Sequence, residues 1–235
     1  LRRGAGKLVE MADAKIQLKN LYKIFGKNPK TAMQHVMDGV GKDELVEKHN
    51  QVLGLKDITL DIPARSIQVI MGLSGSGKST LIRHINRLIE PTDGSVTIDG
   101  DEVLKMNEED LRSFRRSKTA MVFQRFALLP HKTVLQNTIF GLHIQKIDDE
   151  VAKKSALKWI ERVGLSGYED KYHQQLSGGM NQRDGVARAL TKDGDMRLMD
   201  EAVSELDPDI RKDMQDSVIE YQGDVHKTVV MMTDE

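Results

Sequence analysis

The residue types best suited to chemistry stand together in one short run, Gly72-Leu73-Ser74-Gly75-Ser76-Gly77-Lys78-Ser79. The run fits the pattern G-x-x-x-x-G-K-[ST] in full. Its glycines allow successive backbone N–H groups to turn inward around a phosphate, because no Cβ stands in the way. Lys78 can place a positive charge on the β- and γ-phosphates, and the Ser79 hydroxyl can ligate Mg²⁺. The run therefore predicts a site for ATP, or another nucleoside triphosphate, with Mg²⁺.

This loop needs a strand before it and a helix after it. Ile67–Met71 is a short apolar run typical of a buried parallel strand. Lys78 to Ile89 has helical periodicity, and the positive end of such a helix points at the bound anion. A chance glycine-serine turn is the alternative, and the flanking elements disfavour it. The candidate nucleotide ligands are Gly72, Ser74, Gly75, Ser76, Gly77, Lys78, Ser79 and Thr80.

The rest of the chain alternates between strand and helix patterns. Strands are expected at Ile16 to Gly26, Leu53–Ile62, Ala120–Phe123, Met196–Met199 and Thr228–Met232, with a hairpin at Ser95–Ile98 that turns at Asp99-Gly100-Asp101. Helices are expected to begin at Asn28-Pro29 and to span Lys42–His49, Asp148–Val163, Gln182–Leu190 and Pro208–Tyr221. This alternation predicts an α/β fold with a mainly parallel sheet covered on both faces.

Composition excludes several kinds of protein. The chain has 235 residues, 39% of them hydrophobic and 30% charged, which is the balance of a folded globular domain. The net charge of −1 argues against a nucleic-acid coat, and the absence of cysteine excludes disulfides and thiol nucleophiles. No apolar run approaches the ~20 residues that cross a bilayer. We expect residues 1–10, which precede Met11, to be a non-native or disordered extension of a domain that covers 11–235 and is shortened at its C-terminus.

A second segment specifies the kind of nucleotide-binding protein. Leu176-Ser177-Gly178-Gly179-Met180-Asn181-Gln182-Arg183 resembles the L-S-G-G-x-x-Q-R signature of ABC ATPases. Ser-Gly-Gly alone would also suit an ordinary capped helix. A serine and two glycines that open a helix form a second anion-binding N-terminus. The resemblance implies that Ser177, Gly178, Gly179 and Gln182 serve the γ-phosphate of ATP held by an opposite subunit.

Three further segments resemble parts of the same family. Leu198-Met199-Asp200-Glu201 is similar to the Walker B strand, which implies that Asp200 holds Mg²⁺ and that Glu201 polarises the attacking water. Ser204-Glu205-Leu206-Asp207 resembles the D-loop, which crosses the dimer interface. Gln124 resembles the Q-loop glutamine, which reaches Mg²⁺ and senses a permease. Each could be a solvated polar residue if taken alone, but their order indicates an ABC ATPase.

The resemblance implies a P-loop NTPase fold of the ABC ATPase type. Such a fold has a mainly parallel sheet core, an antiparallel β subdomain and a helical subdomain, expected here at about 125–180, with a helical insert at about 28–49. Within the family, Lys23-Ile24-Phe25-Gly26, the insert and Val122 to His131 are similar to ATPases of glycine betaine/proline betaine importers. Phe25 matches the aromatic residue that stacks on adenine in the family. The alternative interpretation, that Phe25 is a core aromatic residue at the end of a strand, is equally favoured.

These importers imply the partners. Two copies of the chain would sandwich two ATP molecules at the cytoplasmic face of the bacterial inner membrane. They would drive an integral membrane permease that a substrate-binding protein supplies, with no nucleic acid involved. An ABC ATPase for another solute is an alternative. A soluble ABC protein of repair or translation is a third reading, but such proteins usually carry long coiled-coil inserts or a second cassette.

Asp234 departs from the family pattern. The family usually places a histidine that contacts the γ-phosphate at this position, and a carboxylate would repel phosphate charge instead. Efficient hydrolysis is therefore less expected than nucleotide binding. A hydrolysis-impaired module for nucleotide binding or dimerisation is the second hypothesis.

Two charged residues fall at positions that the family keeps apolar. Arg197 lies in the Walker B strand and Asp184 in the signature helix. A buried unpaired charge costs several kcal/mol, so each must reach water or find a partner. We expect Arg197 near the helix end at Ala189, about five residues or ~8 Å along the axis from Asp184, which is too far for the two to pair.

Overall fold

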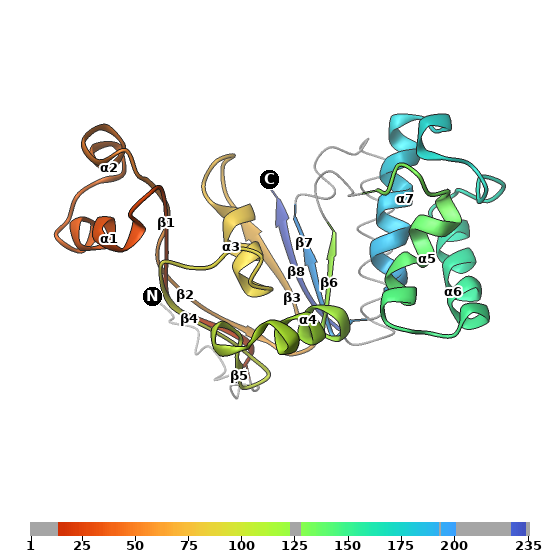
Figure 1. Cartoon of the computed structure of the whole chain (residues 1–235), viewed down its shortest axis with the longest axis horizontal. Coiled ribbons are helices and arrows are strands. Elements are labelled where there is room, and N and C mark those ends of the chain that lie inside the picture. The colour runs from red at the N-terminus through yellow and green to blue at the C-terminus, as the bar shows by residue number, and fades with distance from the viewer. Residues whose placement is uncertain (1–13, 123–127, 193, 201–226, 234–235) are drawn as a thin grey trace, which may run out of the picture. The chain divides into compact units, whose positions relative to one another are not determined.

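The computed structural model describes residues 14–122, 128–192, 194–200 and 227–233. The chain forms two compact units. The first unit combines the described residues up to Ser66 with Glu90–Lys105, and the second combines Ile67–Ile89 with the described residues from Met106 onward. Each unit contains one sheet (Figure 1).

The first unit contains a four-stranded antiparallel sheet in the order β2-β1-β4-β5. Its strands are β1 (Ala14–Phe25), β2 (Val52–Pro63), β4 (Asp93–Ile98) and β5 (Asp101–Glu102). Asp99 and Gly100, which connect β4 to β5, have φ angles of 50° and 86°. Such positive values suit a tight two-residue hairpin. The predicted strands of this region and its hairpin are confirmed.

Two short helices project between β1 and β2, namely α1 (Pro29–Met37) and α2 (Lys42–His49). Pro29 takes the first helical position, as its fixed φ favours, while Asn28 occupies the N-cap without a side-chain capping bond. The helices are held by apolar burial against β1, since Leu45 is fully buried and belongs to one cluster with Tyr22 and Ile24.

The second unit contains a four-stranded parallel sheet in the order β3-β8-β7-β6. Its strands are β3 (Ile67–Met71), β6 (Thr119–Val122), β7 (Met196–Met199) and β8 (Thr228–Thr233). Strands in such sheets are buried on both faces and read as continuous apolar runs. Accordingly Leu198, Val229 and Val230 of the central strands β7 and β8 are fully buried. The prediction that Ile67–Met71 is a buried strand was wrong, because β3 lies at the edge of the described sheet and its Met71 is 66% exposed.

Five helices of the second unit are described. They are α3 (Lys78–Ile85), α4 (Glu108–Ser117), α5 (Val134–Ile144), α6 (Asp149–Arg162) and α7 (Gly178–Thr191), and the short 3₁₀ turns are η1 (Val103–Lys105) in the first unit and η2 (His173–Gln175) in the second. The prediction that α3 continues to Ile89 was wrong, because the chain turns away at Arg87, whose φ is +53°. Helix α7 begins four residues before the predicted Gln182 because Ser177 caps it.

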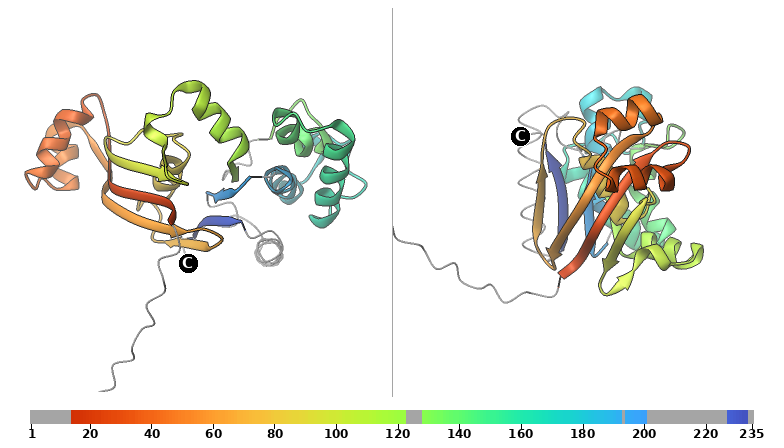
Figure 2. Two further views of the ribbon diagram at one scale, coloured as in Figure 1. Left: turned by 90° about the horizontal axis from the view of Figure 1, so that it is seen from below. Right: turned by 90° about the vertical axis from the view of Figure 1, so that its left-hand side faces the viewer.

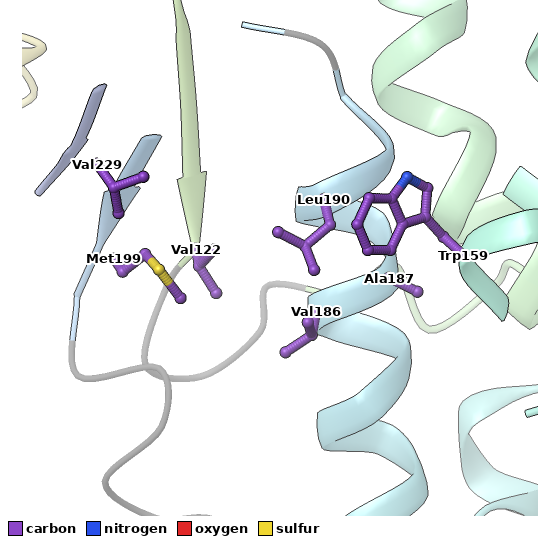
Figure 3. Packing of buried hydrophobic residues seen from close by; sticks show 7 residues of the cluster. All are labelled: Val122, Trp159, Val186, Ala187, Leu190, Met199 and Val229. Atoms are coloured by element: carbon purple, nitrogen blue, oxygen red, sulfur yellow. The ribbon is translucent and has the colours of Figure 1, made fainter. Parts of the chain in front are cut away.

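Helix α7 forms the centre of the second unit's packing (Figure 2). Its apolar residues Val186 and Leu190 pack toward Val122, Met199 and Val229 of the parallel sheet (Figure 3). Trp159 of α6 covers the other side of α7 at Ala187 and is 4% exposed. This layer fixes the signature helix to the strands that carry the phosphate loop and Asp200.

The predicted helix Pro208–Tyr221 and the end of the predicted strand at Phe123 lie outside the described residues. Among the helices that are described, none combines the length and the apolar character needed to cross a membrane.

Candidate nucleotide-binding site

The phosphate loop joins β3 to α3 at the carboxyl end of the parallel sheet. Gly75 and Gly77 have φ angles of 76° and 97°, a region that side chains with a Cβ seldom enter. At Gly72 an added Cβ would meet the Ser76 Oγ at 2.9 Å, so any other residue there would require that hydroxyl to rotate away. The Ser76 N–H donates to the Leu73 carbonyl at 3.1 Å and closes the turn. These constraints explain the glycines of the motif.

Lys78 begins α3 and folds back over the loop. Its side chain is buried, and Nζ donates to the carbonyls of Gly72 at 2.7 Å and Leu73 at 3.0 Å. Ser74, Gly75 and Ser76 are exposed beside it, whereas Ser79 and Thr80 are half-buried in the first turn of α3. The loop thus exposes backbone at a helix N-terminus, where a lysine charge is already in place, and that combination binds anions.

Asp200 directly follows β7, at the same edge of the sheet as the phosphate loop. Its backbone N–H donates to the Val122 carbonyl at 3.0 Å, and its side chain is completely buried. Arg83 of α3 contacts Asp200 Oδ2 through Nε at 2.8 Å and Nη2 at 2.7 Å. Within the described part of the chain, Asp200 Oδ1 has no hydrogen-bond partner. The helix that carries Lys78 and Ser79 is therefore tied directly to Asp200 at the end of β7.

The signature segment opens α7. Ser177 is the N-cap, and its Oγ accepts a hydrogen bond from the Met180 N–H at 3.3 Å. Ser177 and Gly178 are exposed, Gly179 is half-buried, and a Cβ at Gly178 would meet no atom within 4 Å. Gln182 lies in the next turn and is half-buried. The helix N-terminus is therefore open to an anion from outside.

Phe25 ends β1 and belongs to the first unit, whereas the phosphate loop belongs to the second. The residue is 39% exposed, and its ring lies so close to Gly54 that a Cβ there would meet Phe25 Cε2 at 2.7 Å. Lys23 Nζ stands 5.0 Å from the ring centroid. Phe25 is therefore a partly exposed aromatic residue that lies against Gly54 and has a lysine charge over its ring.

The two unexpected charges have separate partners. Arg197 Nη2 donates to the Leu190 carbonyl at 3.1 Å, one residue from the expected position at Ala189. Asp184 Oδ1 accepts from the Thr138 hydroxyl at 3.3 Å, and Asp184 Oδ2 has no partner in the described residues. Burial raises the pKa of Asp184 to about 7, against smaller lowering effects of the Thr138 hydrogen bond and the Arg188 charge.

Several predicted residues cannot be placed. Gln124, Glu201, Ser204 to Asp207 and Asp234 lie outside the described residues. In contrast, sequence reasoning overlooked Arg83. Its position offered a signal, because it follows Ser79 by one helical turn and side chains at i and i+4 share a helix face.

The fold and sequence have clear relatives. The family model described as ABC transporter matches residues 55–204. The chain is 48% identical, over 96% of its length, to the glycine betaine transport ATP-binding protein OpuAA of Bacillus subtilis. It is 50% identical, over 93% of its length, to the glycine betaine/proline betaine transport system ATP-binding protein ProV of Escherichia coli. It covers 54% and 55% of these two relatives, so it spans about half their length.

A solved structure shows the same architecture. The dimeric ATP-binding cassette MJ0796, in a post-hydrolysis state bound to ADP and Pi, superposes with a TM-score of 0.79 at 30% identity. The match covers 94% of this chain and 88% of that one. The parallel sheet, the antiparallel sheet and the helical subdomain together form the ABC ATPase fold. With the family match across the phosphate loop, signature and Asp200, we conclude that the chain belongs to the ABC transporter family.

Proposed function

We propose that this chain is the ATP-binding and ATP-hydrolysing subunit of an ABC importer for glycine betaine/proline betaine-type osmolytes. The observation that carries the nucleotide site is the glycine-rich loop closed around Lys78 at the N-terminus of α3. The loop gathers a lysine charge, exposed backbone and a helix dipole at one point, which suits the β- and γ-phosphates.

The residues present also fit Mg²⁺. This ion prefers oxygen ligands and binds through one or two carboxylates or hydroxyls together with substrate phosphates. Ser79 supplies a hydroxyl, and Asp200 Oδ1 is a buried carboxylate oxygen that has no partner in the described region. When bound there, Mg²⁺ would neutralise charge on the phosphates during transfer. Ser79 and Asp200 would hold it, with Gln124 as a further ligand by resemblance.

The remaining roles rest on the resemblance and on exposure. Glu201 would polarise the attacking water, and Phe25 would stack on adenine. Ser177, Gly178, Gly179 and Gln182 would receive the γ-phosphate from a second copy, which agrees with the open N-terminus of α7. The dimeric state of MJ0796 supports such a homodimer.

The transport assignment depends on the relatives. OpuAA and ProV are described as ATP-binding proteins of glycine betaine transport, and both are close to half identical to this chain. By analogy the dimer would act at the cytoplasmic face of the bacterial inner membrane on an integral permease, which a substrate-binding protein loads. Reconstitution with the permease tests this: betaine should stimulate ATPase activity, and stimulation by an unrelated solute alone would contradict the assignment.

Replacement of Lys78 tests the nucleotide site. Lys78→Ala should weaken ATP binding at least about tenfold, because hydrogen bonds from a charged donor contribute about 1.5–3 kcal/mol each. The measurement is calorimetric titration with ATP and Mg²⁺. Lys153→Ala on the exposed face of α6 is the matched control. Equal ATP affinity in Lys78→Ala and the parent would refute the site.

Asp234 supports a second candidate, a hydrolysis-impaired module that binds ATP and dimerises. Single-turnover hydrolysis distinguishes the two functions. If the chain is a working ATPase, Glu201→Gln should slow the reaction strongly relative to the parent. If it is impaired, parent and Glu201→Gln should be equally slow, and Asp234→His should raise the rate by restoring a hydrogen-bond donor to the γ-phosphate.

A further inference from the structure

Arg83 makes an unsymmetrical contact with Asp200. Two of its three guanidinium nitrogens, Nε at 2.8 Å and Nη2 at 2.7 Å, converge on the same carboxylate oxygen, Oδ2. The usual fork arrangement would place one nitrogen on each oxygen. Here Oδ2 is saturated and Oδ1 has no hydrogen-bond partner among the described residues. The ion pair thus divides the carboxylate into one occupied and one available oxygen.

Asp200 Oδ1, the oxygen without a hydrogen-bond partner in the described residues, lowers the stability of the folded chain. Asp200 is 0% exposed, so water does not solvate Oδ1. A buried polar atom without a partner costs about 1–3 kcal/mol, and more when it is charged. Folded proteins rarely retain such an atom unless it serves a ligand or an ion. Oδ1 therefore indicates a cation-binding position at this edge of the sheet.

Helix α3 connects this position to the phosphates. Ser79 and Arg83 are four residues apart and lie on the same face of the helix. The main chain of Asp200 is anchored independently by its N–H bond to the Val122 carbonyl. Two hydrogen bonds from Arg83 then remove the remaining rotational freedom of the carboxylate. Helix α3 thus carries both Ser79, whose hydroxyl would bind the metal, and Arg83, which orients the carboxylate of Asp200.

We infer that Arg83 is a positioning residue for the metal site: by holding Oδ2 it presents Asp200 Oδ1 to the Mg²⁺ that accompanies ATP. This inference rests on the proposed nucleotide-binding function and assigns a role to a residue outside the recognised motifs. Arg83 orients the ligand without touching metal or phosphate. Lysine is a poor substitute, because its single ammonium can bridge both carboxylate oxygens and cover Oδ1.

The inference is tested by the Mg²⁺ dependence of nucleotide affinity in the parent and in Arg83 variants, and not by the rate of ATP hydrolysis. The affinity for a non-hydrolysable ATP analogue is measured by calorimetry with EDTA and then over a series of Mg²⁺ concentrations, for the parent and Arg83→Lys. Lysine retains the positive charge beside the buried carboxylate, so this variant protects the fold. Arg83→Gln, which retains a hydrogen-bond donor without charge, is the second variant. Arg112→Lys in α4, an exposed arginine paired with Glu108, is the matched control.

We expect both Arg83 variants to match the parent in EDTA and to require about tenfold more Mg²⁺ for tight analogue binding, the usual effect of losing a group that orients a metal ligand. An unchanged Mg²⁺ requirement in Arg83→Lys would overturn the inference. So would an equal loss of affinity with and without metal, since that indicates general damage to the site. Failure of the parent itself to bind the analogue under either condition would contradict the proposed function. It would also contradict the role of Arg83, which rests on that function.

Discussion

Asp184 is a carboxyl group at a position where the signature helix of the family is usually apolar. Its side chain is 1% exposed, and one oxygen accepts only the Thr138 hydroxyl. Burial raises the pKa of Asp184 to about 7 and outweighs the lowering effects of the Thr138 hydrogen bond and of Arg188, one turn along α7. The folded chain therefore keeps a proton on Asp184 to a higher pH than an exposed aspartate would.

This elevated pKa has a definite effect on stability. Between about pH 4, where an unfolded aspartate titrates, and about pH 7 the folded state binds more protons than the unfolded state. The free energy of unfolding contributed by Asp184 is therefore highest below pH 4, falls as pH rises and is constant above pH 7. The difference amounts to at most about 4 kcal/mol.

Asp184→Val should remove that dependence. The variant should be more stable than the parent at about pH 8, and the gain should shrink as pH is lowered toward about 5, because the parent's carboxyl becomes neutral. Urea unfolding at several pH values measures the difference. Asp184→Asn is the control, since it retains a polar partner for Thr138 without titrating. A gain that stays constant with pH would contradict the assigned pKa.

At single positions, sequence reasoning succeeded where one physical rule dominates. The glycines of the phosphate loop and the burial of Arg197 near the end of α7 follow from local geometry and from strand direction. The contact between Arg83 and Asp200 joins residues 117 positions apart, and neither residue type signals the other. Thr138 likewise lies 46 positions from Asp184, so its hydrogen bond could be found only in the folded chain.

Among the elements, helices α4 and α5 were not predicted individually from the sequence. Helix α4 buries only Phe114, with Leu111 half-buried one turn before it, so its apolar stripe is short. Its start depends on the Asn107 side chain, which accepts from two backbone N–H groups. Helix α5 is apolar on most faces because it packs against both α6 and α7. A pattern of period 3.6 cannot reveal α5, whereas Leu111 and Phe114, spaced i and i+3 among charged residues, offered a signal for α4.

The start of α5 offers a test of capping. Thr133 Oγ1 accepts from the Gln136 N–H at 3.3 Å, and Gln136 Oε1 accepts from the Thr133 N–H at 3.1 Å, which completes a capping box. Thr133→Ala should lower the free energy of unfolding by about 1 kcal/mol and the Tm by about 2–4 °C. Thr133→Ser keeps the hydroxyl and should remain near the parent in a thermal unfolding experiment. Equal losses in both variants would exclude the cap as the cause.

For the whole molecule, local patterns could not show how the chain divides. The first unit takes in Glu90–Lys105 because Ile16 pairs with Ile98 and Leu18 with Val96 across the antiparallel sheet. Such pairings join distant segments, so periodicity predicts each strand but not its neighbour. The order β3-β8-β7-β6 of the parallel sheet was not predicted, since no pattern within a strand identifies the strand beside it.

Association of two whole chains should depend on the exposed start of α7. Gly178→Asp places a carboxylate in open space at the first helical position, where an acidic residue is favourable for the helix. The fold and the ATP affinity of the single chain should therefore persist, while repulsion from the γ-phosphate of a partner should abolish ATP-dependent dimerisation. Light scattering with and without ATP measures this, with Gly178→Ala as control. ATP-induced dimers of Gly178→Asp would argue against the composite site.

The contact of Lys78 with the loop carbonyls has a consequence for selectivity. Because Nζ already donates to Gly72 and Leu73, the rotamer freedom of the lysine, worth up to about 2 kcal/mol, is lost on folding and not when a ligand arrives. Binding then becomes an exchange in which an incoming oxygen must compete with two carbonyls for one ammonium. A doubly charged terminal phosphate attracts the ammonium more strongly than two neutral carbonyls do, whereas adenosine carries no charge that could replace them. The loop thereby selects ligands by their terminal phosphate and not by their base.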